Sequence, residues 1–235
     1  MEEKELRTTT KQRVVIIVIA VLTLVSTILA YMLIVLAGNK SSSTAETSPE
    51  MAALQEEYSA KQTEVNNYAA TLSSQYFNDL NSFRGRVKAY NATTANSDGL
   101  KTVDLKEGTG RELAEGDTDY FAYYIGWCAD ESIFDSSFND KDNPTALGAP
   151  LSASMGLIEG WNQGVIGMKI GGVREISIPT ELAYGDTQEI CGGTGSPLKF
   201  IVLPIADEKL TTLSNELEAI YGKMVEVYSA SSSAS

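Results

Sequence analysis

The sequence contains no histidine and only two cysteines, and its formal net charge is -13 at pH 7. Without histidine, Ser-His and Cys-His catalysis and histidine-ligated zinc are excluded. Cys128 and Cys191 are too few for a zinc site made of thiolates alone, and their separation matches no metal-ligand spacing. An acidic chain repels phosphate backbones, so we expect no nucleic acid among its partners.

One segment near the N-terminus lacks charge altogether. Residues 14–37 (VVIIVIAVLTLVSTILAYMLIVLA) would form a helix about 36 Å long, against a hydrocarbon core of about 30 Å. We therefore predict a transmembrane helix at residues 14–37. Its uninterrupted length argues against two alternatives, a buried core helix and a cleaved signal peptide, whose apolar stretch is normally about 7 to 15 residues.

Basic residues lie mainly before this segment, and only Lys40 follows it closely; those before it are Lys4, Arg7, Lys11 and Arg13. The positive-inside rule then predicts a cytoplasmic N-terminus at residues 1–13, with everything after residue 38 outside. We expect a single-pass protein of the cell membrane whose main domain is extracytoplasmic.

Two amphipathic helices are predicted to flank that domain. Residues 38–48 (GNKSSSTAETS) have the composition of a linker, and Ser48, Pro49 and Glu50 then supply an N-cap, a first-turn proline and an acidic first turn. The spacing predicts a helix over 49–90. A second helix is predicted at 208–228, with a disordered tail at 229–235.

The apolar positions of the first helix do not keep a strict heptad. Packing onto its own chain is therefore favoured over self-association, which remains the alternative. Our hypothesis is that the two flanking helices pack on each other beside the sheet.

Between these helices, residues 98–207 change to short strands and glycine turns, after a polar boundary at 91–99. This pattern predicts an α+β domain, with an antiparallel sheet and one short helix laid on its face. The expected helix covers 157–167, and the expected strands cover 100–105, 118–127, 133–136, 173–178 and 198–205.

Five segments of this domain carry aromatic residues next to turns: YYIGW at 123–127, IFDSSF at 133–138, GLIEGWNQGVIGMKIGG at 156–172, IPTELAYG at 178–185 and SPLKFIVLPI at 196–205. In order and spacing they resemble the FKBP family of peptidyl-prolyl isomerases. The resemblance implies a half-open antiparallel sheet wrapped around a short helix, with a shallow apolar pocket for a proline ring. It also implies a reaction that needs neither a metal nor a cofactor.

The resemblance assigns a role to each matching residue. Trp161 would be the pocket floor, and the Tyr184 hydroxyl and Ile158 N–H would hydrogen-bond substrate carbonyls. Asp135 would lie at the pocket edge, polarising or orienting the substrate or holding Tyr124, which would itself be a pocket wall. The catalytic residues would be Tyr124, Asp135 and Tyr184. The remaining substrate-binding residues would be Phe134, Leu157, Ile158 and Phe200.

The competing interpretation makes every one of these aromatics ordinary core. We accept it for Phe121, Ile176 and Ile178, which fit alternating core-facing strand positions. For Trp161, Tyr124 and Tyr184, the flanking glycines and the family motifs favour the pocket.

Two stretches depart from the family pattern. Before residue 157 the usual aromatic is missing, and only Leu147, Leu151 and Met155 are available. The loop after Tyr184, which shapes substrate preference in the family, has no proline until Pro197. In an oxidising exterior we expect a disulfide between Cys128 and Cys191 to fasten this loop to a strand end, contributing about 2 to 4 kcal/mol.

The leading function is therefore a peptidyl-prolyl isomerase that assists folding of extracytoplasmic proteins, with X-Pro segments of unfolded chains as its substrates. One alternative is a non-catalytic FKBP-like chaperone that only binds peptides, motivated by the altered segment before residue 157. The other is an oligomeric envelope scaffold in which the flanking helices are the functional part.

Overall fold

The computed structural model describes residues 48–233. The predicted cytoplasmic N-terminus and transmembrane helix lie outside these residues, as does the linker up to residue 47. Within residues 48–233, no helix is both long enough and apolar enough to cross a bilayer.

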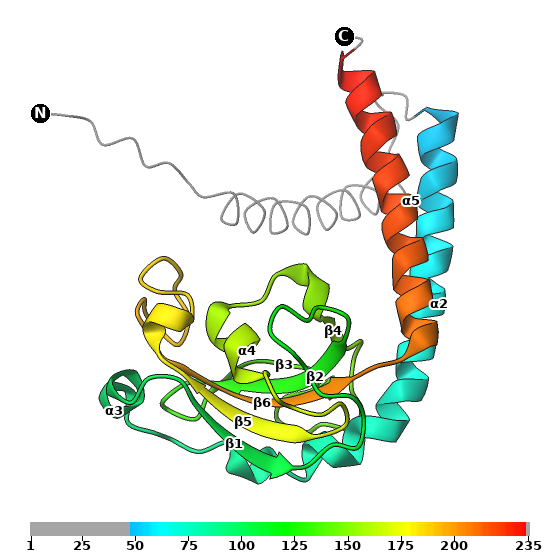
Figure 1. Ribbon diagram of the computed structural model, residues 1–235. Helices are drawn as coiled ribbons and strands as arrows, with labels where there is room; N and C mark the ends of the chain where they lie inside the picture. Colours follow the sequence, from blue (N-terminus) through cyan, green and yellow to red (C-terminus); the bar gives the residue numbers. More distant parts are fainter. Residues whose placement is uncertain (1–47, 234–235) are drawn as a thin grey trace, which may run out of the picture. The chain divides into compact units, whose positions relative to one another are not determined.

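A six-stranded antiparallel sheet forms the centre of this unit (Figure 1), in the order β1-β5-β6-β2-β3 with β4 also paired to β2. The strands are β1 (Lys101–Lys106), β2 (Phe121–Trp127), β3 (Ile133–Ser136), β4 (Leu151–Ser152), β5 (Val173–Ile178) and β6 (Leu198–Ile205). The central strands are buried on both faces because side chains alternate across a sheet and both faces are covered. The α+β fold is thus confirmed.

One face of the sheet is covered by the short helix α4 (Glu159–Gly164). Two glycines let this helix lie against β5, since a Cβ at Gly160 would be 2.2 Å from Ile178 Cγ2 and one at Gly164 would be 2.5 Å from Ile176 Cγ2. Ile176 and Ile178 are fully buried there, as expected for core residues. Together with Trp161 and Phe200 they belong to one apolar cluster, which we call the pocket-side core.

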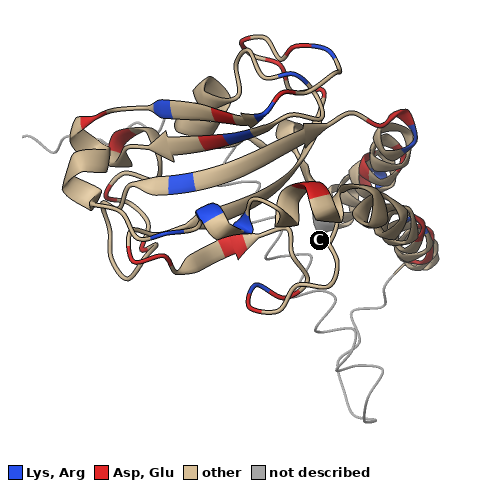
Figure 2. Cartoon of the chain, turned by 90° about the horizontal axis from the view of Figure 1, so that it is seen from below, with Lys and Arg blue, Asp and Glu red and all other residues tan. Residues whose placement is uncertain are grey.

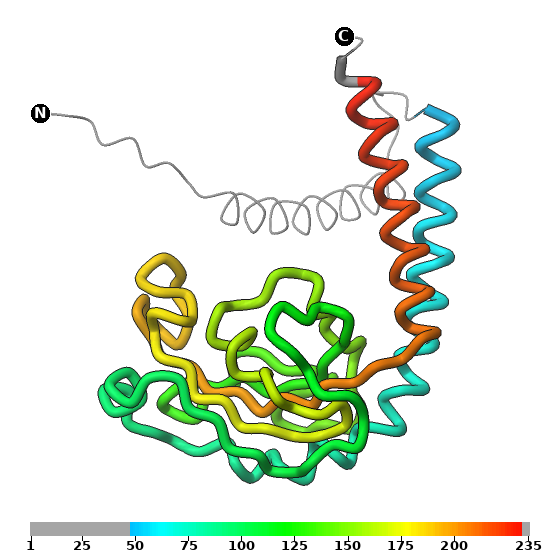
Figure 3. The backbone as a smooth tube through the Cα atoms, viewed as in Figure 1, coloured from blue at the N-terminus to red at the C-terminus, as the bar shows by residue number. Residues whose placement is uncertain are grey.

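The opposite face is covered by the lower part of α2 (Pro49–Asn81). The upper part of α2 packs antiparallel against α5 (Glu208–Ser233), which follows the sheet in sequence (Figure 3). The hypothesis that the two flanking helices pack on each other is therefore confirmed. Leu72 and Leu80 of α2 bury against Tyr123 and Ile125 of β2. This second cluster, the helix-side core, also contains Phe121, another residue expected in the core.

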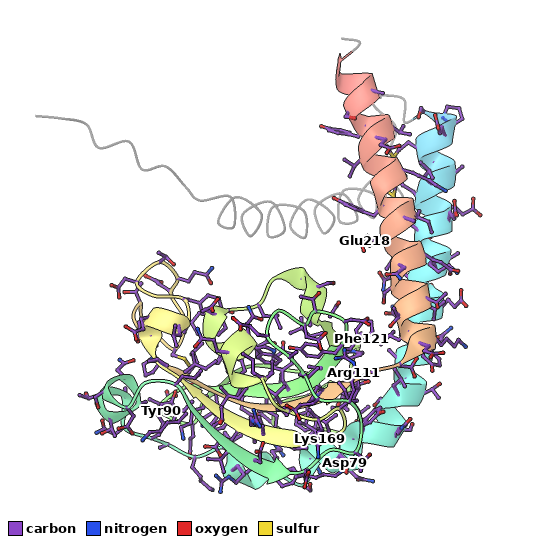
Figure 4. The ribbon with its side chains drawn as sticks, viewed as in Figure 1. Asp79, Tyr90, Arg111, Phe121, Lys169 and Glu218 are labelled. Atoms are coloured by element: carbon purple, nitrogen blue, oxygen red, sulfur yellow. A yellow bond between two sulfur atoms is a disulfide. The ribbon has the colours of Figure 1, made fainter. Side chains whose placement is uncertain are left out.

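The first helix ends at Asn81, earlier than the predicted residue 90. A 3-10 turn at Arg84–Arg86 and extended backbone follow. Tyr90 ties this stretch to the sheet, because its N–H donates to the Ala129 carbonyl at 2.9 Å and its hydroxyl to the Pro197 carbonyl at 2.9 Å (Figure 4). Those sheet contacts replace the helical hydrogen bonds that periodicity alone predicts.

The predicted limits of α4 and α5 are also wrong, and the polar boundary stretch contains a short helix that was not predicted. The polar boundary stretch holds α3 (Ala92–Ser97), which Asn91 caps by accepting from the Thr94 N–H at 2.8 Å. Helix α5 continues to Ser233, through most of the tail that composition predicted to be disordered. Helix α4 is shorter than predicted, and Gly167, with φ of 77°, turns the chain away after it.

Charges on the sheet are paired across neighbouring strands (Figure 2). Glu175 of β5 accepts from Lys199 of β6 at 3.0 Å and from Arg86 at 2.7 Å. Asp79, at the lower end of α2, accepts from Lys106 of β1 at 2.8 Å (Figure 4). The lower end of α2 is thereby attached to the edge strand β1 as well as to the face of the sheet.

Candidate active site

Trp161 forms the centre of the candidate site, with only 2% of its surface exposed. Helix α4 presents its indole to two rings from the sheet, Tyr124 of β2 and Phe200 of β6. The ring centroids lie 5.6 Å and 5.3 Å from the indole, at interplanar angles of 85° and 79°. Such edge-to-face contacts hold aromatic rings in fixed relative orientations.

Phe134 of β3 extends this aromatic surface, and its ring centroid lies 5.6 Å from that of Phe200. Gly126 makes the contact possible, because a Cβ there would lie 2.8 Å from Phe134 Cζ and from Phe200 Cε1. The glycine of the Tyr-x-Gly motif is thus required by close ring packing. The structure brings the four aromatic residues Tyr124, Phe134, Trp161 and Phe200 together.

Asp135 lies exposed at the rim, and its Oδ2 accepts a hydrogen bond of 2.6 Å from the Tyr124 hydroxyl. Burial, and then this hydrogen bond, raise the pKa of the Tyr124 phenol, which therefore stays protonated as the donor. Of the roles considered for Asp135, holding Tyr124 is the one for which the structure provides a contact.

Tyr184 follows the turn after β5 and is half-buried. Burial, and then the nearby charge of Asp135, raise the pKa of its phenol, and the hydroxyl has no hydrogen-bond partner among the described residues. Within residues 48–233, the Ile158 N–H also donates no hydrogen bond. Both donors are therefore available to a ligand. Leu157 and Ile158 are half-buried and pack against the pocket-side core.

The segment before α4 supplies an aliphatic side chain where the family usually has an aromatic one. Leu151 packs against the pocket-side core. Leu147 instead belongs to the helix-side core, and Met155 is 40% exposed. One wall of the site is consequently smaller than an aromatic residue would make it.

Cys128 and Cys191 form the expected disulfide, with their Cα atoms 5.5 Å apart. Cys128 directly follows β2, and Cys191 lies in the loop after Tyr184. The bond attaches this loop, whose residues Ile190 and Cys191 contact the pocket-side core, to the end of the strand that carries Tyr124.

Two residues that support the site were not identified from the sequence. The hydroxyl of buried Tyr120 accepts a hydrogen bond of 3.1 Å from Trp161 Nε1. Buried Arg174 donates to the carbonyls of Gly164 and Ile166 at 3.0 and 2.8 Å, and to Asp104, which fixes the C-terminal end of α4. The period-two pattern that places Tyr120 on the same face as Tyr124 was a usable signal; for Arg174 there was none.

A model of the family described as FKBP-type peptidyl-prolyl cis-trans isomerase matches residues 110–203. An FK506-binding protein of Neisseria meningitidis serogroup B is 38% identical over 90 residues, covering 37% of this chain and 75% of that protein. The chloroplastic peptidyl-prolyl cis-trans isomerase FKBP13 of Arabidopsis thaliana is 38% identical over 104 residues, covering 40% and 46% respectively. The crystal structure of AtFKBP13 matches 48% of this chain and 95% of that chain, with 30% identity and a TM-score of 0.37.

The family model and the sequence relatives define the class of protein. The chain belongs to the FKBP-type peptidyl-prolyl cis-trans isomerase family and is an enzyme of that type.

Proposed function

We propose that this isomerase acts on X-Pro segments of unfolded polypeptides outside the cytoplasm, held at the membrane by residues 14–37. The proposed catalytic activity is supported mainly by one observation: Trp161 forms an aromatic floor and contacts the rings of Tyr124 and Phe200. A pyrrolidine ring would lie on this floor, with Phe134 and Ile158 as neighbouring walls.

Rotation about an X-Pro bond faces a barrier of about 20 kcal/mol, because amide resonance is lost in the twisted state. An enzyme lowers the barrier by binding the twisted amide more tightly than the planar one and by excluding water that favours the planar dipole. The aromatic floor would exclude that water. The Tyr184 hydroxyl and the Ile158 N–H would orient the flanking peptide by donating to its carbonyls.

The extracytoplasmic part of the proposal is supported by three features that agree. The apolar run at 14–37 is long enough to span a bilayer, the basic residues precede it, and the chain's two cysteines form one disulfide. Structural disulfides persist in oxidising compartments and are rare in the cytosol of most organisms.

The catalytic role is tested by measuring isomerisation of a short Xaa-Pro peptide by the full chain in detergent micelles. We expect Trp161→Ala to reduce kcat/KM by about 100-fold, since it removes the floor, and Tyr184→Phe by about tenfold, since it removes one donor. Tyr228→Phe, on the exposed last turns of α5, is the matched control and should retain full activity. Circular dichroism checks that each variant is folded.

Full activity in a folded Trp161→Ala variant would contradict the assignment of the pocket. An inactive wild type that still binds an unfolded protein would favour the chaperone alternative.

The compartment is tested by alkylating intact cells that express the full chain, before and after reduction. We expect Cys128 and Cys191 to react with the alkylating reagent only after reduction. Free thiols in untreated cells, together with protection of the domain from added protease, would overturn the extracytoplasmic assignment while leaving the isomerase assignment intact.

A further inference from the structure

We propose that Tyr120 is a positioning residue for isomerisation, which sets the orientation of the Trp161 indole through a single buried hydrogen bond. The inference rests on the proposed role of Trp161 as the pocket floor. It adds a buried residue that meets the indole at the edge carrying its N–H and is not part of the ligand-facing surface.

Tyr120 immediately precedes β2, and its side chain lies on the same face of the sheet as Tyr124. Only 3% of its surface is exposed. Its hydroxyl accepts from Trp161 Nε1 at 3.1 Å, and its carbonyl accepts from the Ala153 N–H at 3.0 Å. The residue is therefore held at its backbone and at its hydroxyl, and the phenol presents its oxygen to one atom of the indole.

The ring contacts of Trp161 leave one degree of freedom that this bond removes. Tyr124 and Phe200 meet the indole edge to face, and such contacts hold the ring plane but bond none of its polar atoms. The indole N–H is the only polar group of the side chain, and at 2% exposure it has no access to water. Pairing it with Tyr120 selects one orientation of the ring in its cavity.

Removing the Tyr120 hydroxyl would leave a buried donor unsatisfied, which is more costly than losing a hydrogen bond at the surface. The indole would then rotate toward water or a carbonyl, and the floor would no longer match the twisted proline. Burial raises the pKa of the Tyr120 phenol, so the accepting oxygen keeps its own proton at neutral pH.

The chain offers a closely matched control three residues further along, within β2. The hydroxyl of Tyr123 is buried on the opposite face of the sheet and has no hydrogen-bond partner among the described residues. Tyr120→Phe and Tyr123→Phe therefore remove the same atom from two buried phenols. Only the first of these substitutions breaks a bond to the site.

We expect Tyr120→Phe in the full chain to lower kcat/KM for an Xaa-Pro peptide about three- to tenfold, the range associated with one neutral hydrogen bond. Tyr123→Phe should leave kcat/KM within about twofold of wild type. In a Trp161→Phe background, where no indole N–H exists, Tyr120→Phe should have no further effect.

A second readout does not depend on activity. The chain has two tryptophans, so isotope-labelled tryptophan gives two indole N–H resonances, and Trp127→Phe identifies which belongs to Trp161. Tyr120→Phe should shift the Trp161 resonance and leave that of Trp127, which donates to the Lys88 carbonyl, in place. Tyr123→Phe should move neither resonance substantially.

An unmoved Trp161 resonance in folded Tyr120→Phe would overturn the proposal, as would unchanged kcat/KM. A loss of activity equally large in the Trp161→Phe background would overturn it as well, because Tyr120 would then act on something other than the indole. If wild type itself were inactive, the resonance shift would still decide whether Tyr120 positions the indole, separately from the proposed function.

Discussion

The two faces of the sheet are built from the same strands, but their buried tyrosine hydroxyls are paired differently. On the pocket side, the Tyr124 hydroxyl donates to Asp135 and the Trp161 indole donates to Tyr120. On the helix side, Tyr123 is fully buried with its hydroxyl unpartnered among the described residues. The Trp127 indole of the same helix-side core does have a partner, since it donates to the Lys88 carbonyl. The contrast is therefore between individual tyrosines: the phenols beside the site hold or are held by a neighbour, whereas the Tyr123 phenol packs as bulk alone.

The difference also separates stability from function. The helix-side core is closed by α2 and α5, and its members are mostly fully buried. The pocket-side core is only partly closed, because Tyr124, Phe134, Leu157 and Ile158 remain half-buried around the site. The pocket side therefore retains exposed apolar surface that a ligand can cover.

The largest expected effect comes from Leu80→Ala on the helix side. Leu80 is 0% exposed, so its truncation removes apolar contacts and leaves a cavity, which costs about 2 to 5 kcal/mol of unfolding free energy. Because the residue lies across the sheet from Trp161, kcat/KM of the folded variant should remain within about twofold of wild type. Denaturant unfolding and peptide isomerisation measure the two quantities.

Leu217→Ala on α5 is the milder comparison, since Leu217 is only partly buried against the same core. It should cost less than Leu80→Ala and should also leave activity unchanged. A large loss of kcat/KM in either folded variant would mean that the two faces are coupled.

The parts of the fold predicted from sequence are those governed by local pattern. Alternation and turns predicted the sheet, three- and four-residue spacing predicted α2 and α5, and the motifs led to Tyr124, Phe134, Trp161 and Phe200, which the structure brings together. These motifs could be read because each places an aromatic ring beside a glycine or a turn. Gly126 shows why, since two rings occupy the space that a side chain would need.

The parts that were missed depend on contacts distant in the sequence. The end of α2 depends on Tyr90 reaching the Pro197 carbonyl, and the anchoring of α4 depends on Arg174 reaching both α4 and Asp104. The continuation of α5 into a serine-rich tail contradicts composition; there the Ser229 and Ser231 hydroxyls donate to the Glu226 and Tyr228 carbonyls of the same helix, at 2.8 Å each. Tyr120 was missed because a tyrosine beside a strand is more often ordinary core, and only the indole pairing distinguishes it.

A smaller effect on stability, but one that reaches the site, is expected from Gly160→Ala. The new Cβ would lie 2.2 Å from Cγ2 of Ile178, a branched and fully buried side chain that has little room to move. Helix α4 must then shift, and overpacking of this kind typically costs about 1 to 3 kcal/mol. Since Trp161 is the next residue, kcat/KM should fall in the folded variant, in contrast to Leu80→Ala.

Gly222→Ala is the matched control for this substitution, because Gly222 is helical and exposed and has nothing within 4 Å of its would-be Cβ. There the same change should stabilise the chain by about 0.5 to 1 kcal/mol, since alanine favours the helix, and should leave kcat/KM unchanged. Opposite signs of the stability change at the two glycines would show that close packing, and not helix propensity, requires Gly160. If Gly160→Ala were neutral for both stability and activity, the pocket-side face would tolerate repacking, and the proposed dependence of the site on a fixed position of α4 would be wrong.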